Sequence, residues 1–137
     1  MGLIHLDAGV VIGFLDADDA HHESAAQALA GSLRSGDRLA MAASAFAECL
    51  VGPSRRGERA IATVRQLFER LPIDIIDLDA DTARRAAALR AKHASLRLPD
   101  ALVLATASEN SAECLITTDR RWPTARKLGL AITITVL

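Results

Sequence analysis

The chain has 137 residues, of which half are hydrophobic and only 3% aromatic, and its formal net charge is −1 at pH 7. This length predicts one domain with a substantial core of Ala, Leu, Ile and Val side chains. The near-neutral charge excludes a nucleic-acid-binding protein that is basic over its whole surface.

The first half of the chain alternates short apolar runs with longer segments of helical character. In chain order we predict a strand at 3–6, a helix at 10–15, a helix at 20–33, a strand at 38–41 and a helix at 45–51. The acidic stretch 16–19 interrupts the first helix and offers an N-cap for the second. Ser44 is expected to cap the third helix, and Gly52-Pro53 to end it.

The second half continues the same alternation. We predict a helix at 57–70, a strand at 73–76, a helix at 79–93, a helix from Pro99 to near Glu109, a strand at 114–117, a short helix at 124–128 and a final strand at 132–136. Pro99 suits the first turn of its helix. Alternating strands and helices predict an α/β fold, with a mostly parallel sheet of about five strands and helices on both faces.

The cysteines and the apolar runs indicate where the protein works. Cys49 and Cys114 match no zinc-binding spacing and lie in apolar stretches, so we expect buried, reduced thiols. The longest mostly apolar run, 39–51, is too short to span a bilayer and contains Glu48. No basic segment precedes the first strand, and Asp7 interrupts its apolar run, which argues against a signal peptide. We therefore expect a cytoplasmic protein with no membrane partner.

Four acidic residues occupy positions where a carboxylate needs a partner. Asp7 ends the first strand, and Asp119 follows the fourth. Glu48 is the only charge in the helix at 45–51, and Asp100 lies in the first turn of the helix that ends near Glu109. Taken singly, Glu48 could be solvated, Asp100 could stabilise a helix N-terminus, and Asp119 could be a turn residue. Asp7 is the most specific of the four, because solvation explains it poorly.

The fold would bring these acids to the carboxyl ends of the strands, where ligands bind in parallel sheets. Two carboxylates about 5 Å apart repel by about 3 kcal/mol at an effective dielectric constant near 20. Such a cluster needs raised pKa values or bound cations. Oxygen ligands without nearby Cys or His favour Mg²⁺ or Mn²⁺, and Thr117 and Thr118 offer hydroxyls that could orient a carboxylate.

Four segments occur in order along the chain: Ile4-His5-Leu6-Asp7, Ser44-Ala45-Phe46-Ala47-Glu48-Cys49-Leu50, Leu96-Arg97-Leu98-Pro99-Asp100-Ala101-Leu102-Val103-Leu104-Ala105 and Leu115-Ile116-Thr117-Thr118-Asp119-Arg120. Together they resemble the PIN-domain ribonucleases, and most closely the VapC-type toxins of bacterial type II toxin–antitoxin pairs. The segment Leu98-Pro99-Asp100-Ala101 is the most specific of these motifs.

The resemblance implies a three-layer PIN-like fold, with residues 1–137 as a single nuclease domain. It implies that Asp7, Glu48, Asp100 and Asp119 are the catalytic, metal-binding acids and that Thr117 supports them. It also implies an endoribonuclease toxin that uses Mg²⁺ or Mn²⁺ to hydrolyse RNA such as tRNA or rRNA. Such toxins are commonly homodimers, neutralised by a cognate antitoxin whose tail enters the active-site groove.

Two other functions are also considered. One follows from a departure from the family pattern, and the other is that of a different class of α/β domain. Many relatives carry Thr or Ser, then Ser or Asn, after the first acid, whereas this chain has Ala8-Gly9. The missing side-chain hydrogen bonds favour a catalytically weak or degenerate PIN domain that only binds a partner. The second alternative is a Mg²⁺-binding receiver-type signalling domain, which would need paired acids after the first strand and a Lys after the fifth. Here Asp7 stands alone and no Lys follows the last strand.

Overall fold

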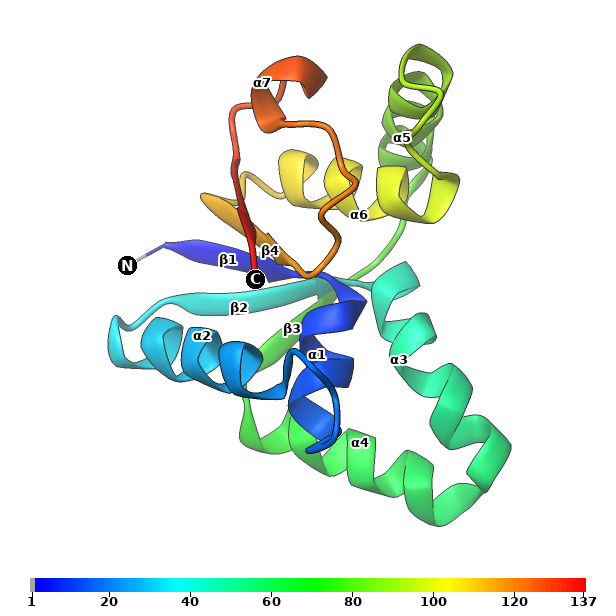
Figure 1. The fold of residues 1–137 in the computed structure, drawn as a ribbon. Coiled ribbons are helices and arrows are strands. Elements are labelled where there is room, and N and C mark those ends of the chain that lie inside the picture. Colours follow the sequence, from blue (N-terminus) through cyan, green and yellow to red (C-terminus); the bar gives the residue numbers. More distant parts are fainter. Residues whose placement is uncertain (1) are drawn as a thin grey trace.

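The computed structural model describes residues 2–137, which form a five-stranded parallel sheet in the order β3-β2-β1-β4-β5 (Figure 1). The strands are β1 (Leu3–Leu6), β2 (Arg38–Ala42), β3 (Ile73–Ile76), β4 (Cys114–Thr117) and β5 (Thr133–Val136). β1 lies at the centre, where Ile4 pairs with Leu39 of β2 and with Cys114 of β4. The predicted parallel α/β fold is confirmed.

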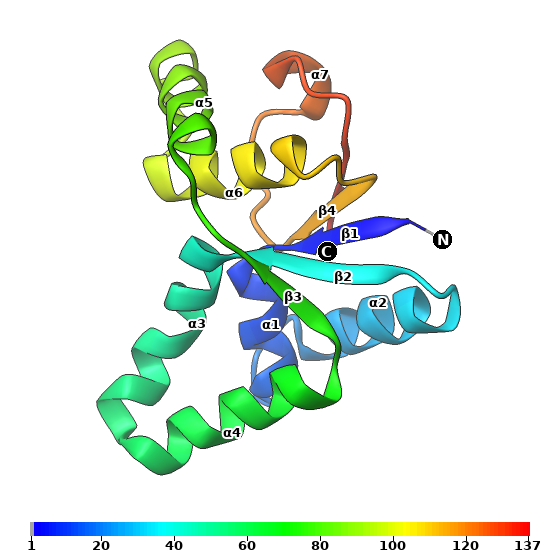
Figure 2. The same cartoon turned by 180° about the vertical axis from the view of Figure 1, so that it is seen from behind.

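Helices cover both faces of this sheet. They are α1 (Ala8–Leu15), α2 (His22–Arg34), α3 (Ala43–Arg56), α4 (Glu58–Arg70), α5 (Ala80–Lys92), α6 (Leu98–Glu109) and α7 (Ala125–Leu128). Two opposite views place α1, α2, α3 and α4 on one side of the sheet and α5, α6 and α7 on the other (Figures 1 and 2). Among residues 2–137, no helix combines the length and the apolar character that a membrane crossing requires.

The strand order reverses at β1. The chain moves outward from β1 to β2 and β3, and then returns to place β4 on the other side of β1. Loops leaving neighbouring strands diverge at such a point, which creates a crevice at their carboxyl ends. Receiver-type domains instead have the order 2-1-3-4-5, so the receiver alternative is wrong.

The core is aliphatic, as the composition predicted. Leu6, Leu39, Leu104 and Leu115 are fully buried between the layers, because a parallel sheet covered on both faces exposes neither face to water. Cys49 is a buried free thiol, as predicted. Cys114 is free but only half-buried, since it begins β4 beside the edge strand β5.

The predicted end of the third helix is wrong. α3 runs from Ala43 to Arg56 and passes through Gly52-Pro53, although proline cannot donate the helical hydrogen bond at its position. Pro53 is buried, so packing offsets the missing bond. Gly57, with φ of 108°, ends the helix instead. Ser44 does not cap α3: the N-cap is Ala42, which makes no side-chain cap bond.

The acidic stretch at 16–19 also has a different role from the predicted one. α2 begins at His22, and its N-cap His21 makes no side-chain cap bond. Asp19 Oδ1 instead accepts a hydrogen bond from the His21 backbone N–H at 2.8 Å, which closes the turn before the helix. Apart from α3, the predicted elements match the observed ones within two residues.

Candidate functional site

The four acids singled out in the sequence come from four different elements. Asp7 follows β1 directly, Asp119 lies two residues beyond β4, Asp100 is in the first turn of α6, and Glu48 is on α3. Asp7 and Asp119 therefore occupy the carboxyl ends of the two strands at the reversal point. The charges of Asp100 and Glu48 both raise the pKa of Asp7, and that of Asp119 raises the pKa of Asp100. The fold thus brings the acids into one electrostatically coupled group.

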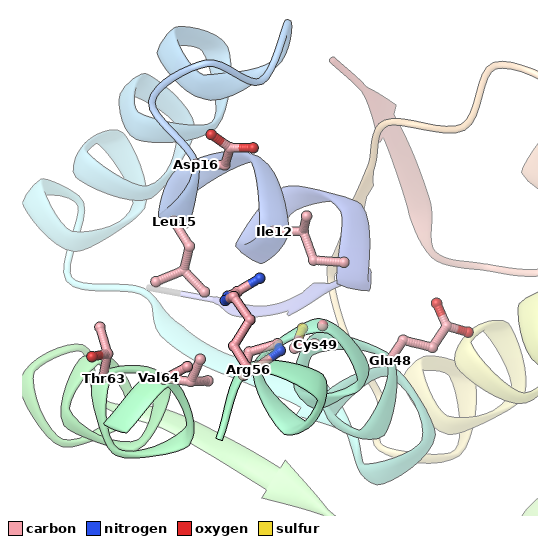
Figure 3. Close-up of a pocket in the computed structure, with 11 residues that line it drawn as sticks. Ile12, Leu15, Asp16, Glu48, Cys49, Arg56, Thr63 and Val64 are labelled. Carbon is pink, nitrogen blue, oxygen red and sulfur yellow. The ribbon is translucent and has the colours of Figure 1, made fainter. Parts of the chain in front are cut away.

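Glu48 stands at the edge of a cavity between α1, α3 and α4. The cavity has a volume of about 590 Å³ and an apolar wall that includes Ile12, Leu15 and Val64. Figure 3 shows Glu48 pointing away from Asp16, toward the side of α6. Burial raises the pKa of Glu48, the charge of Asp100 raises it further, and Arg97 partly offsets the rise.

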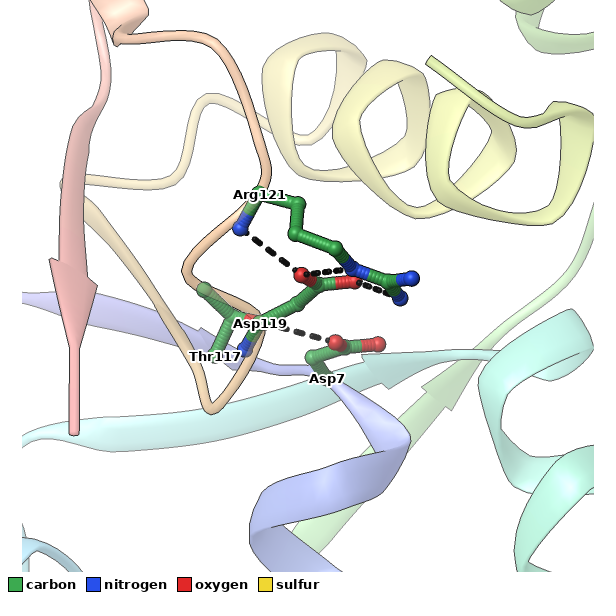
Figure 4. A network of polar contacts seen from close by, with 4 residues as sticks. All are labelled: Asp7, Thr117, Asp119 and Arg121. Carbon is green, nitrogen blue, oxygen red and sulfur yellow. Dashed lines mark hydrogen bonds and ion pairs between the residues drawn. The ribbon is translucent and has the colours of Figure 1, made fainter. Parts of the chain in front are cut away.

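Asp7 is held by hydrogen bonds to both carboxylate oxygens. Oδ1 accepts from the Ala8 backbone N–H at 2.8 Å, and Oδ2 accepts from the Thr117 hydroxyl, also at 2.8 Å (Figure 4). The first bond makes Asp7 the N-cap of α1. Burial raises the pKa of Asp7 to about 6, and both hydrogen bonds oppose that rise. A carboxylate with this pKa is still mostly ionised at pH 7 but strongly favours a cation nearby.

Thr117 connects two of the acids. It is fully buried at the end of β4. Its hydroxyl donates to Asp7 and accepts a hydrogen bond from the Asp119 backbone N–H at 3.1 Å. One buried side chain therefore fixes the Asp7 carboxylate and the backbone at Asp119 together.

The pair Ala8-Gly9 has a structural explanation. Both oxygens of Asp7 already have partners that do not come from the side chains of residues 8 or 9. A Cβ atom at Gly9 would collide with the Thr118 hydroxyl. The threonine beyond β4 therefore occupies the space that a side chain at position 9 would need.

Asp100 is half-buried at the start of α6. Burial raises its pKa, and the negative charge of Asp119 adds to the rise. Trp122, Arg97 and Arg121 lower it. The indole Nε1 of Trp122 is buried and meets no acceptor at hydrogen-bonding geometry, so we regard its effect on Asp100 as that of a nearby dipole.

Asp119 differs from the other three acids because it already has a cationic partner. Its Oδ1 accepts from the Arg121 backbone N–H at 2.9 Å and from Arg121 Nε at 3.1 Å, while Oδ2 accepts from Nη2 at 3.0 Å. These bonds lower the pKa of Asp119. The acids thus divide into three with raised pKa values and one neutralised by arginine.

Two arginines of this site were not singled out from the sequence. Arg97 is exposed at the N-cap of α6, and its charge lowers the pKa of Glu48, Asp100 and Asp119. Arg121 is tied to Asp119. The only sequence signals were an arginine just before the motif at 98–101 and another two residues after Asp119, and arginines at such positions are usually solvated.

The donor set fits a hard divalent cation. The cluster offers carboxylate oxygens, and the raised pKa values of Asp7, Glu48 and Asp100 mean that the nearby arginines leave the repulsion and burial uncompensated. Within residues 2–137, no three Asp, Glu, His or Cys side chains are already gathered closely enough to hold one ion. Sharing an ion would require these side chains to rotate toward one another.

Comparison with known proteins relates this site to one family. A family model described as PIN domain matches residues 4–128. No curated protein matches the chain significantly by sequence, whereas 35 chains of solved structures match its fold.

Three of these structures illustrate the likeness. VapBC2 from Rickettsia felis, bound to a DNA fragment from its promoter, has a TM-score of 0.72 and 16% identity over 98% of each chain. A toxin–antitoxin complex from Klebsiella pneumoniae has a TM-score of 0.63 and 26% identity over 85% of this chain and 86% of the other. VapC20 from Mycobacterium tuberculosis, described as a toxin that cleaves the sarcin–ricin loop, has a TM-score of 0.66 and 18% identity over 82% and 86%.

Proposed function

The chain belongs to the PIN-domain family, and we propose that it is a VapC-type toxin that hydrolyses RNA phosphodiesters. The observation that carries this proposal is the coupled group of acids at the reversal point of the sheet, three of which have raised pKa values. The resemblance found in the sequence and the PIN-domain match both support this proposal. Asp7, Glu48, Asp100 and Asp119 are its proposed catalytic acids.

PIN-domain nucleases generally use divalent metal ions, and we propose Mg²⁺ or Mn²⁺ here. The acids would hold the ion, and Thr117 would keep the Asp7 carboxylate in place through its hydrogen bond to Oδ2. When bound, such an ion supplies an activated water and stabilises the charge that develops on the phosphate. The protein adds two cations at the site, Arg97 and Arg121, which reduce the repulsion between RNA phosphates and the acids.

We further propose a cognate antitoxin as the regulatory partner, with a homodimer as the assembly and the cytoplasm as the location. The structures of similar fold include toxin–antitoxin complexes, which supports this proposal. The cavity between α1, α3 and α4 offers apolar walls beside Glu48, where an antitoxin segment could reach the acids.

The test is cleavage of total tRNA and rRNA by purified, antitoxin-free protein. Cutting should require Mg²⁺ or Mn²⁺ and stop with EDTA. Asp7→Asn should reduce the rate by at least about 100-fold while RNA binding persists, because Arg97 and Arg121 remain and one negative charge is lost.

Asp77→Asn is the matched control, since Asp77 is exposed beyond β3. It should cut like wild type. Equal cutting by wild type and Asp7→Asn would contradict the proposed site. Tight RNA or antitoxin binding without cutting under either metal would favour a degenerate PIN domain.

A further inference from the structure

Arg121 occupies the position of a cation at Asp119. Three hydrogen bonds join the residues, and the guanidinium meets both carboxylate oxygens side by side (Figure 4). The charge of Arg121 also reaches Asp100. Arg121 therefore neutralises part of the acidic group from inside the protein.

The ion pair between Arg121 and Asp119 can dissociate while the surrounding turn stays in place. The Arg121 side chain is 79% exposed, whereas that of Asp119 is only 19% exposed. An exposed ion pair contributes little to stability, because water and salt screen it and a long side chain must be immobilised. The backbone bond from the Arg121 N–H does not depend on the guanidinium, so the side chain can leave while the turn keeps its shape.

A divalent ion bound by Asp119 would compete with Arg121 for the same two oxygens. Release of the guanidinium would expose a planar group whose paired N–H donors match a phosphate. Arg121 follows Asp119 by two residues, so a released side chain stays beside the acids. Arg120 provides a contrast: it is exposed, and its side chain makes no hydrogen bond or ion pair within residues 2–137.

We propose that Arg121 is a displaceable internal cation, which holds Asp119 in the metal-free protein and turns to an RNA phosphate when a divalent ion takes Asp119. This inference rests on the proposed function, since it assumes that Asp119 can bind metal. Under this proposal, Arg121 helps to position the RNA only when a metal ion is bound. Its mechanism needs only a side-chain rotation.

The direct test is a Mg²⁺ titration followed by NMR of the arginine Nε–H groups, with the Arg121 signal assigned from its loss in Arg121→Lys. In the metal-free protein this signal should exchange slowly with water, because the group is bonded to Asp119. Mg²⁺ should shift it and speed its exchange along the curve of Mg²⁺ binding. Asp119→Asn should show a weakly bonded signal already without metal. An unchanged Arg121 signal at saturating Mg²⁺, or no Mg²⁺ binding, would overturn the proposal.

A second measurement compares variants that lose the same charge. Arg121→Gln should bind Mn²⁺ about two- to five-fold more tightly than wild type, since the competitor is gone. Arg120→Gln should change the affinity by less, because its charge is screened and unpaired. Equal effects of the two variants would mean that only net charge matters and would overturn the displacement.

The RNA contact is tested by kinetics at saturating Mn²⁺. Arg121→Gln should raise KM for RNA by about three- to ten-fold with kcat much less affected, and Arg120→Gln should not. Unchanged KM would overturn the phosphate contact. If no variant cuts RNA, the proposed nuclease activity fails, but the NMR and Mn²⁺ measurements still decide whether metal displaces Arg121.

Discussion

Single side chains in this site act by holding other side chains. Thr117 lies fully buried between Asp7 and the backbone of Asp119. Its hydroxyl donates one of the two hydrogen bonds that keep the pKa of Asp7 from rising further with burial. Thr117 is therefore expected to keep Asp7 ionised near neutral pH.

Thr117→Val should raise the pKa of Asp7 above about 6 and weaken Mn²⁺ binding at pH 7 by about ten-fold. Valine has nearly the same shape, but the Asp7 carboxylate and the Asp119 N–H each lose a partner, so the free energy of unfolding should fall by about 2–3 kcal/mol. The measurement is a pH titration of the Asp7 carboxyl by ¹³C NMR. Thr106→Val is the matched control, because the buried Thr106 hydroxyl bonds only to the Leu102 carbonyl of its own helix. An unchanged pKa of Asp7 in Thr117→Val would contradict the role of Thr117.

Between elements, one close approach at the site joins α1 to the loop after β4. Gly9 lies in the first turn of α1, and the Thr118 hydroxyl fills the space beside it. The end of β1 and the end of β4 are thereby packed together where Asp7 and Asp119 emerge. A glycine in a helix normally lowers stability by about 1 kcal/mol relative to alanine, so this one has a packing reason.

Gly9→Ala should therefore affect stability differently in two backgrounds. In wild type the new Cβ displaces the Thr118 hydroxyl, and the variant should be neutral or destabilised. In Thr118→Ala the space is free, and the same change should stabilise by up to about 1 kcal/mol. Urea unfolding of the double-mutant cycle measures this. Gly31→Ala is the control, because a Cβ there meets nothing within 4 Å. Equal stabilisation by Gly9→Ala in both backgrounds would refute the packing explanation.

Sequence patterns predicted the helices and strands well, because the spacing of apolar residues and the turn residues that flank each element determine local structure. They failed at Gly52-Pro53, where burial of Pro53 outweighs its helix-breaking tendency, and at Ser44, whose cap is not used. The strand-end positions of Asp7 and Asp119 were predicted, since a strand's end can be located from its apolar run. The Arg121 ion pair was not, because an exposed arginine gives no sequence signal of its partner.

At the scale of the whole molecule, the central strand β1 carries His5 and is followed directly by Asp7, and the pKa values of these two residues are shifted in opposite directions. His5 is fully buried on β1, with Nε2 2.8 Å from Asn110 Nδ2, and burial lowers its pKa from 6.5 to about 4. Asp7, two residues later, has a pKa raised from 3.8 to about 6. Burial is the main cause of both shifts. His5 is buried on the central strand of the sheet and Asp7 just beyond its end, so the fold contributes to how stability depends on pH.

His5 and Asp7 change the pH dependence of stability in opposite directions. Between about pH 6.5 and 4, unfolded His5 takes up a proton that folded His5 refuses, so its contribution to stability falls as the pH falls. Between about pH 3.8 and 6, folded Asp7 keeps a proton that unfolded Asp7 has lost. Its contribution is fully present below pH 3.8 and is lost as the pH rises through about 6. The two slopes therefore oppose each other between about pH 4 and 6.

Asp7→Asn should remove the contribution of Asp7 to the pH dependence of stability and leave that of His5. In EDTA, the free energy of unfolding of this variant should fall more steeply than that of wild type from pH 6.5 to 4, with a His5 contribution of at most about 3 kcal/mol. The asparagine oxygen can still accept the hydrogen bond from the Ala8 N–H, and its amide NH2 can donate to the Thr117 hydroxyl, so the fold should persist. Urea unfolding at several pH values gives the two curves, and Asp77→Asn should follow wild type. Parallel curves for wild type and Asp7→Asn would mean that Asp7 does not retain its proton in the folded protein, and would remove the strongest electrostatic argument for a cation at this site.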